Sequence, residues 1–357
     1  MHRQQKSART LLGHLLLLVG GFALSLGLAE ALVRTTHPFE RGHRPPGGLF
    51  EMDKDLGWKL NAGTTVPHHS EYFDVIYEIN ARGYRDPMRD GAKAPDSYRA
   101  LLYGDSRIFG WGIPQDQRFS DRIERRVHDL ELWNRGVVAY GLDQQVMVYE
   151  REGDSLEADE VIFFVSPSTL ERNQMSYMSN KPKPRFVLSP DGTLEAIGIT
   201  LVAHERANAL YSLLARFHLP YFVDRRFKSL LTASREEGGQ TELPDAHTAI
   251  SELDKAILSR AAQLALERRH RLTILAVPEM AESARAFLSN HATVVLLDTR
   301  LLKENENLRF GEHDKHWNPQ GNELIAEQLT RHFEEQLAEW PWHRRSSERL
   351  AVSVPRS

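Results

Sequence analysis

The sequence predicts an α/β fold in which a five-stranded, mainly parallel sheet lies between two layers of helices. Four short apolar runs have the length and composition of buried strands, turn residues bound them, and one further strand is expected between the first two runs. Between these runs, apolar residues recur every three or four positions, as on the buried face of an amphipathic helix. Strands that alternate with helices form parallel sheets that are covered on both faces. The apolar runs are residues 100–103, 161–165, 272–277 and 294–297, and the further strand ends at 133–136.

Length, charge and cysteine content limit the class of protein. The 357 residues suffice for one large domain or two small ones, and 41% of them are hydrophobic, as in an ordinary globular protein. The formal net charge of −4 argues against a general nucleic-acid-binding protein, which is usually basic. The absence of cysteine excludes disulfides, thiolate metal sites, a cysteine nucleophile and a lipidated N-terminal cysteine.

The N-terminal part of the chain has the pattern of a membrane anchor. Residues 1–10 are polar and basic, and we expect them to form a cytoplasmic tail. Residues 11–33 are almost wholly apolar, and a helix of this length spans roughly 34 Å, enough to cross a bilayer. Gly27-Leu28-Ala29 could serve as a signal cleavage site, whereas the length favours an uncleaved anchor; a buried globular helix is a further alternative. A short tail that stays inside places the rest of the chain outside the cytoplasm.

Composition divides the rest of the chain into segments. Proline and glycine mark a linker, and short strand-like runs with turn residues between them mark a β-rich segment after it. The expected segments are a linker at 34–48, a small β-rich lead-in at 49–97, the α/β domain at 98–339 with an insertion at 174–245, and a flexible tail at 340–357.

The insertion interrupts the alternation of strands and helices at a place where substrate loops would gather. Its basic residues Lys181, Lys183 and Arg185 could meet an anionic saccharide, although charges of this kind are more often solvated. The elements expected in the insertion are a hairpin at 186–194, amphipathic helices near 203–216 and 221–233, and a flexible loop at 234–244.

A serine follows the first strand of the predicted sheet. The run at 100–103 stops at Gly104-Asp105-Ser106, and the carboxyl end of such a strand is where open α/β sheets place their sites. Glycine lets the chain turn tightly there and leaves the hydroxyl of Ser106 uncrowded. A serine nucleophile needs a base that a third group orients. Asp314 and His316, just before the last predicted helix, supply a carboxylate and an imidazole.

These two motifs, in this order, resemble those of the SGNH/GDSL hydrolase family, over about residues 50 to 340. The lead-in sequences Leu56-Gly57-Trp58 and Gly83-Tyr84-Arg85-Asp86 are similar to those of its membrane-anchored bacterial branch. The resemblance implies a three-layer α/β/α domain with a flavodoxin-like sheet. For this branch we expect a single-pass protein of the inner membrane, with its catalytic domain in the periplasm.

The resemblance also implies roles for individual residues. Ser106 would be the nucleophile, His316 the general base, and Asp314 the acid that holds the imidazole. The backbone N–H groups of Ser106 and Gly136 would face the oxyanion. The reaction would be acyl transfer through a serine ester, which needs no cofactor.

The sequence departs from the family at two places. After the third strand the family has an oxyanion-donating asparagine, whereas this chain has Ser166-Pro167-Ser168-Thr169 and no asparagine before Asn173. The hydroxyl of Ser168, or Asn173 if the loop folds back, could donate instead; the alternative is a degenerate, weak or non-hydrolytic site. One residue, rather than the common two, separates Asp314 from His316. Asp-x-His-Trp is partly similar to alginate-type O-acetyltransferases, in which Asp-x-His precedes the serine.

Several further residues lie close to these motifs in the sequence. The candidates for substrate contact are Asp105, Arg107, Asn134, Asn173 and Trp317. Among the other histidines, we expect His68, His69 and His313 to be solvated. His313, Asp314 and His316 could chelate a metal ion, but closely spaced loop ligands without a further partner make a poor site, and we expect no metal.

Three functions fit these observations. The first is a serine esterase that acts on an acylated extracytoplasmic glycan or lipid, and the second is an O-acyltransferase that delivers the acyl group to a sugar hydroxyl. The third is a binding protein of an envelope polysaccharide pathway with a decayed site. Intact Ser106, Asp314 and His316 favour the first two, and the sequence at 166–168 favours the third. The sequence identifies no protein partner, and no nucleic-acid partner is expected.

Overall fold

The structure is a computed structural model of the whole chain. The residues that it describes are 2–36, 45–89, 92–178, 181–199, 217–220, 222, 223, 226, 250–278, 280, 282–290, 292–298, 300–311 and 314–339. The chain divides into two units, which are described separately: Met1–Gly47 with Val202–Glu242, and Gly48–Leu201 with Leu243–Ser357. Outside the described residues lie the helix expected near 203–216, most of that near 221–233, the loop at 234–244, the tail at 340–357 and His313.

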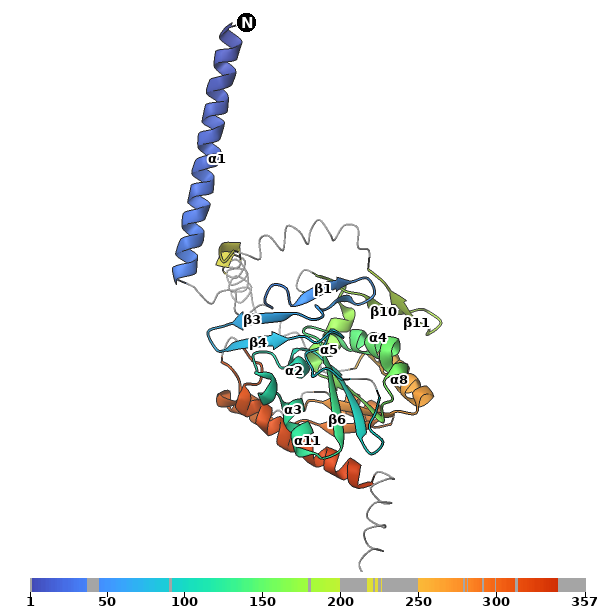
Figure 1. Cartoon of the computed structure of the whole chain (residues 1–357). Helices are drawn as coiled ribbons and strands as arrows, with labels where there is room; N and C mark the ends of the chain where they lie inside the picture. The colour runs from blue at the N-terminus through green and yellow to red at the C-terminus, as the bar shows by residue number, and fades with distance from the viewer. Residues whose placement is uncertain are drawn as a thin grey trace, which may run out of the picture. The chain divides into compact units, whose positions relative to one another are not determined.

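In the first unit, α1 (His2–Thr36) is one continuous helix (Figure 1). Its segment Gly13–Thr36 has 24 residues and is long and apolar enough to cross a membrane, as a signal sequence also can be. Near the end of this segment, the carboxylate of Glu30 accepts the backbone N–H groups of His218 and Leu219, at 2.8 Å each. The expected anchor at 11–33 therefore overlaps the candidate membrane-spanning segment over residues 13–33.

The second unit contains the predicted sheet. Its strands pair in the order β6-β5-β7-β12-β13, and every pairing is parallel. This is the flavodoxin-like order, and it confirms the predicted fold class. The register pairs Gly104 with Gly136 and Val165 with Ala276, so the carboxyl ends of the strands reach the same edge. The strands are β5 (Tyr98–Gly104), β6 (Leu130–Gly136), β7 (Glu160–Val165), β12 (Arg271–Ala276) and β13 (Thr293–Leu296).

Helices cover both faces of this sheet, which completes the three predicted layers. On one face α3 (Phe119–Arg126) packs against α11 (Pro319–Glu339), and on the other α4 (Leu142–Glu152) packs against α8 (Glu252–Arg268) (Figure 1). The shorter helices are α2 (Ser106–Phe109), α5 (Pro167–Glu171), α9 (Glu282–Ser289) and α10 (Arg300–Glu304), with single 3₁₀ turns at Gln115–Gln117, Gly153–Ser155, Arg172–Gln174 and Glu306–Leu308.

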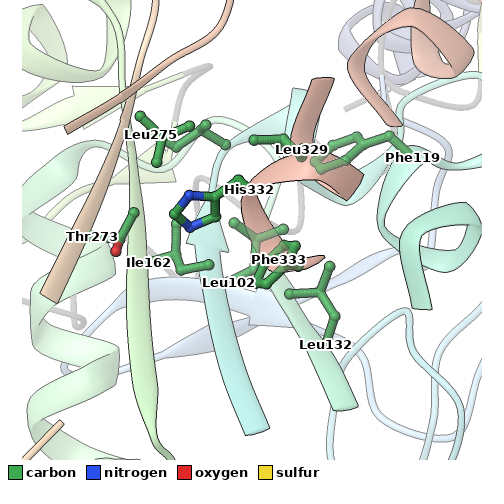
Figure 2. Close-up of a pocket in the computed structure, with 10 residues that line it drawn as sticks. Leu102, Phe119, Leu132, Ile162, Thr273, Leu275, Leu329, His332 and Phe333 are labelled. Carbon is green, nitrogen blue, oxygen red and sulfur yellow. The ribbon is translucent and has the colours of Figure 1, made fainter. Parts of the chain in front are cut away.

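Side chains of the sheet alternate between the two helical layers, as the pleat requires. Figure 2 shows Leu102 of β5 and Ile162 of β7 beside Phe333 of α11, where they line a small apolar cavity. One residue further along β5, the ring of Tyr103 contacts that of Tyr149 on α4, with 5.8 Å between centroids. Both faces of the sheet are buried, which explains why most of its strands contain an apolar run.

The lead-in consists of two antiparallel hairpins, β1 (Phe50–Asp53) with β2 (Gly57–Leu60), and β3 (Thr65–His69) with β4 (Asp74–Glu78). The indole N–H of Trp58 donates to the carbonyl of Val138 at 3.1 Å, and the hydroxyl of Tyr140 donates to the carbonyl of Trp58 at 2.6 Å. Buried hydrogen bonds therefore tie the lead-in to the loop that follows β6.

Two further hairpins occupy the described part of the insertion. They are β8 (Tyr177–Met178) with β9 (Lys181–Pro182), and β10 (Arg185–Leu188) with β11 (Leu194–Ile197), the second at the position expected from the sequence. Lys183 is buried, and its ammonium group forms an ion pair with the buried carboxylate of Asp143. The sequence left two alternatives for Lys183, a solvated charge or contact with a saccharide, and both are wrong. The ammonium group is buried, and a buried ammonium needs a buried counter-charge.

Gly136 is the point at which β6 and α2 come closest. A Cβ at this position would lie 2.4 Å from the backbone nitrogen of Phe109, so a side chain would displace α2. We expect Gly136→Ala to lower the free energy of unfolding by about 3 kcal/mol, as overpacking in a core does. Urea denaturation of the detergent-solubilised protein measures this change. Gly198→Ala, at an exposed position with open space around it, is the matched control and should change stability by less than about 0.5 kcal/mol. Equal stabilities of the two variants would contradict the close contact.

Candidate active site

Ser106 lies at the turn from β5 into α2. β5 ends at Gly104, and Asp105 is the N-cap of α2, with its carboxylate accepting the backbone N–H of Arg107 at 2.9 Å. Gly104 has no room for a side chain, because a Cβ there would lie 2.0 Å from the side chain of Ile108. This tight turn places Ser106 at the carboxyl edge of the sheet as the first residue of α2.

His316 and Asp314 lie on the loop that precedes α11. The loop folds back on itself, since the N–H of Phe310 donates to the carbonyl of His316 at 3.2 Å and that of Gly311 to the carbonyl of Asp314 at 3.1 Å. Oδ1 of Asp314 accepts the backbone N–H of His316 at 3.0 Å and lies 2.7 Å from its Nδ1. With a single residue between them, one carboxylate oxygen holds both the backbone and the ring of His316.

The structure brings the three residues together. Oγ of Ser106 lies 2.7 Å from Nε2 of His316, although 210 positions separate them in the sequence. A continuous line of hydrogen bonds runs from the hydroxyl of Ser106 through the imidazole of His316 to the carboxylate of Asp314. This arrangement can activate a serine, because the imidazole can accept its proton while the carboxylate stabilises the resulting cation. The side chain of His316 is 29% exposed, so solvent has access to it.

Asp314 itself is buried, and both of its oxygens have partners. The indole N–H of Trp111 donates to Oδ2 at 3.0 Å. Burial raises the pKa of Asp314, but hydrogen bonds from His316 and Trp111, together with the charge of the imidazole, outweigh burial and hold this pKa below its usual range. Asp314 is therefore a carboxylate at neutral pH and can stabilise an imidazolium.

The expected oxyanion donors differ in their availability. As the first residue of α2, Ser106 has an N–H with no acceptor within its helix. The N–H of Gly136 donates to Oδ1 of Asn134 at 3.0 Å, so it already has an acceptor. Oγ of Ser168 lies 3.0 Å from Oγ of Ser166, which is the N-cap of α5.

Another backbone N–H near this edge has no acceptor. Ala139, in the loop after β6, has φ of 70°, a left-handed conformation that costs a residue with a side chain roughly 1 kcal/mol. In the described part of the chain, the N–H of Ala139 makes no hydrogen bond. The contacts of Trp58 with Val138 and Tyr140 hold both neighbours of Ala139. Strain that the surroundings maintain is typical of functional sites. The sequence analysis missed Ala139, because an alanine carries no sign of its backbone angle.

Two candidate substrate residues lie in the interior. Nδ2 of Asn134 donates to the carbonyl of Ile108 at 2.7 Å and to Oγ of Ser120 at 3.0 Å, which joins β6, α2 and α3. Asn173 is fully buried; its Oδ1 accepts the N–H of Asp143 at 3.0 Å, and its Nδ2 donates to Asp254 at 2.6 Å. Both amides are satisfied by neighbouring protein groups.

Asp105 is fully buried between two arginines. Its Oδ2 accepts Nη1 of Arg172 at 3.0 Å and lies 3.5 Å from Nη1 of Arg107. Burial raises the pKa of Asp105, but the two guanidinium groups and the backbone N–H of Arg107 outweigh burial and hold the pKa below its ordinary value. The side chain of Arg107 is 30% exposed, with its guanidinium 6.0 Å from the ring centre of Trp317, which is itself buried.

The expectation that His68 is solvated is wrong. His68 is 3% exposed, its Nδ1 lies 3.0 Å from the hydroxyl of Tyr77, and its ring meets that of Trp111 edge-on at 4.6 Å. His69, by contrast, is exposed, with Nδ1 2.7 Å from Asp74. Among the described residues, which do not include His313, no group of three or more His, Cys, Asp or Glu side chains could hold a metal ion.

Other supporting contacts that the sequence analysis missed come from the lead-in. The buried guanidinium of Arg85 donates to the carbonyls of Phe109, Gly110 and Ile113, at 3.2, 2.7 and 2.5 Å. The hydroxyl of Tyr77 accepts the N–H of Gly112 at 2.8 Å. These contacts shape the loop after α2. The sequence Gly83-Tyr84-Arg85-Asp86 was the available signal, but a pattern of residues does not identify carbonyl groups as partners.

The fold and the site together define an α/β protein with a serine–histidine–aspartate arrangement at the carboxyl edge of a parallel sheet. No protein-family model matches the chain, and no curated protein sequence matches it. Its structure is similar to solved structures of lipolytic proteins of the G-D-S-L family, which its motifs resemble, and to those of an esterase and a lipase/acylhydrolase.

Three of these structures illustrate the likeness. A lipolytic protein of the G-D-S-L family from Veillonella parvula DSM 2008 is 11% identical, with a TM-score of 0.38, over 66% of this chain and 97% of that one. The psychrotrophic esterase EstA from Pseudoalteromonas sp. is 9% identical, with a TM-score of 0.41, over 68% and 100% of the two chains. A lipase/acylhydrolase from Enterococcus faecalis is 10% identical, with a TM-score of 0.36, over 67% and 96%.

The ion pairs of Asp105 should make stability depend on pH. Because the folded pKa is below the unfolded one, Asp105 stabilises the fold fully above the unfolded pKa of about 3.9, and this contribution is lost as pH falls through the folded pKa. We expect Asp105→Asn to lower the free energy of unfolding by roughly 2 kcal/mol at pH 7. Urea denaturation from pH 7 to pH 3 should show the difference from wild type shrink below about pH 4.

Asp96→Asn is the control, since Asp96 is exposed, and its effect should stay within about 0.5 kcal/mol at every pH. A constant difference between Asp105→Asn and wild type down to pH 3 would show that the charge of Asp105 is not what stabilises the turn.

Proposed function

We propose that this protein is a membrane-anchored, serine-dependent acyl ester hydrolase. The observation that carries the proposal is the line of hydrogen bonds from Ser106 through His316 to Asp314, with 2.7 Å at each of its two steps. A surface histidine and an unrelated serine would have no reason to meet at this distance at the carboxyl edge of a parallel sheet, where such folds bind their ligands.

In the proposed reaction, Ser106 Oγ attacks the carbonyl carbon of an ester while Nε2 of His316 takes the hydroxyl proton. The tetrahedral intermediate collapses as the bond to the alcohol oxygen breaks and His316 returns the proton to that oxygen. A water molecule then gives a proton to His316 and attacks the acyl-serine. Collapse of this second intermediate releases a carboxylic acid and restores the hydroxyl of Ser106. Asp314 stabilises the imidazolium in both halves.

For the oxyanion, we propose the backbone N–H groups of Ser106 and Ala139 as donors. Both lack an acceptor among the described residues, whereas the N–H of Gly136 is bound to Asn134. The hydroxyl of Ser168 would contribute by turning away from Ser166. Removal of one oxyanion donor typically lowers the rate by about 10²- to 10³-fold, so each of the two backbone donors would contribute substantially to catalysis.

The proposed location is the outer face of the inner membrane, and the proposed substrate is an acylated glycan or lipid of the envelope. The candidate membrane-spanning helix Gly13–Thr36 supports an anchor, which would keep the site near such substrates. Arg107, partly exposed beside Ser106, is the proposed substrate contact. The Asp314-x-His316-Trp317 sequence, partly similar to alginate-type O-acetyltransferases, favours one alternative: delivery of the acyl group to a sugar hydroxyl.

Activity-based labelling tests the nucleophile. A fluorophosphonate probe should label wild-type protein at Ser106, and hydrolysis of p-nitrophenyl acetate should fall at least about 10³-fold in Ser106→Ala. Ser155→Ala, at an exposed position, is the matched control and should keep the label on Ser106 and the hydrolysis rate. Equal hydrolysis by wild type and Ser106→Ala would remove this serine from the mechanism. Faster formation of acylated sugar than of free acid, when an oligosaccharide is added, would identify a transferase.

The labelled protein also tests the oxyanion donors. In a crystal structure of the phosphonyl adduct, the phosphonyl oxygen should lie about 3 Å from the backbone nitrogens of Ser106 and Ala139. An oxygen that points away from Ala139, toward the backbone nitrogen of Gly136, would assign the second donor to Gly136 instead.

A further inference from the structure

Trp111 contacts two members of the proposed catalytic triad. It lies in the Gly110-Trp111-Gly112 loop after α2, and its indole N–H donates to Oδ2 of Asp314 at 3.0 Å in a buried position. The centroid of its ring system is 5.5 Å from that of His316, with the two planes 30° apart. One side chain therefore forms a hydrogen bond to the acid and packs against the face of the base.

The bond to Oδ2 fixes the rotation of the carboxylate. Oδ1 of Asp314 already accepts the backbone N–H of His316 and lies against its Nδ1. The remaining oxygen, Oδ2, therefore decides how the carboxylate is rotated. Without a donor, Oδ2 would be a buried, unsatisfied carboxylate oxygen, and the carboxylate would turn to regain a partner. Any such turn would move Oδ1 away from the ring of His316.

The β3–β4 hairpin holds Trp111 in turn. The ring of His68 meets that of Trp111 edge-on at 4.6 Å, and the ring of Phe73 does so at 6.3 Å. The hydroxyl of Tyr77 accepts the N–H of Gly112 at 2.8 Å and lies 3.0 Å from Nδ1 of His68. Gly112 has φ of 71°, and a Cβ there would lie 2.6 Å from Phe310, so the loop fits only with glycine at this position.

We propose that Trp111 is a positioning residue that orients Asp314 toward His316, and that the β3–β4 hairpin fixes Trp111 through His68 and Tyr77. The lead-in then belongs to the active site, rather than serving only as a covering segment. The inference rests on the proposed serine chemistry for its kinetic consequence, whereas the orientation of Asp314 can be observed without turnover.

The first test is Trp111→Phe in the full-length protein in detergent. Phenylalanine keeps an aromatic ring but removes the N–H, so kcat for p-nitrophenyl acetate should fall about 10-fold or more while KM stays within about 2-fold. The matched control is Trp133→Phe, since Trp133 is also buried but its indole N–H has no partner in the described part of the chain. This control should keep kcat within about 2-fold, and equal kcat values for the two variants would overturn the proposal.

A spectroscopic readout separates positioning from a general loss of structure. In ¹⁵N-labelled protein, the low-field proton resonance of the His316 Nδ1–H bond to Asp314, identified by its absence in Asp314→Asn, should move or broaden in Trp111→Phe. It should stay in place in Trp133→Phe. An unmoved resonance in Trp111→Phe would overturn the proposal even if kcat fell. If wild type hydrolyses no ester, the proposed function fails, and this resonance still decides the role of Trp111.

Tyr77→Phe tests the hairpin and does not depend on the folding of Trp111→Phe. It removes the hydroxyl that joins His68 to Gly112 and leaves the buried ring. We expect kcat to fall about 3-fold, with the same resonance moving in the same direction as in Trp111→Phe. A Tyr77→Phe protein in which kcat and resonance both match wild type would overturn the part assigned to the hairpin.

Discussion

The buried carboxylate of Asp314 is the constraint on which the rest of the site depends. A charged group removed from water must find hydrogen-bond donors for both oxygens, or its ionised form becomes unfavourable. The structure provides the backbone and ring of His316 on one oxygen and the indole of Trp111 on the other. The backbone N–H belongs to His316 itself, before α11, and the indole comes from the loop after α2. Satisfying one charge therefore brings the imidazole of His316 and the turn at Ser106 together.

The distance between Ser106 and His316 also depends on two buried amides, one on β6 and one on α11. Asn134 joins β6 to α2, where Ser106 begins, and to Ser120 of α3. Asn322 of α11 accepts the N–H of Phe119 at 3.1 Å and donates to the carbonyl of Trp317, next to His316, at 2.9 Å. Hydrogen bonds of buried polar groups thus connect the elements that carry Ser106 and His316 through the protein interior. Packing alone, which is not directional, would leave more freedom at the 2.7 Å contact.

The fold was predictable because its signal is local. Most of the strands contain a short apolar run, and strands that alternate with helices leave few possible topologies. Ser106, Asp314 and His316 stood out because their residue types and their places relative to predicted elements both fit one chemistry. Trp111 and His68 had no such signal, since a tryptophan between glycines and a histidine in a short strand acquire meaning only from neighbours that folding supplies. For the same reason, the sequence did not predict that Lys183 is buried against Asp143.

After β7 this chain has a serine-containing sequence where the family pattern has an asparagine, and the polar side chains of this sequence form defined hydrogen bonds. Ser166 caps α5, and the side chain of Thr169 accepts the N–H of Ser166 at 2.9 Å, so these polar groups build the start of a helix. An oxyanion site would then depend on backbone donors, whose positions the main chain fixes. The left-handed turn at Ala139 is unfavourable by itself, yet Arg172 binds the carbonyl of Tyr140 at 3.0 Å with the same nitrogen that holds Asp105. That guanidinium therefore links the strained turn directly to the N-cap beside Ser106, and the strain persists because the buried charge of Asp105 requires the arginine.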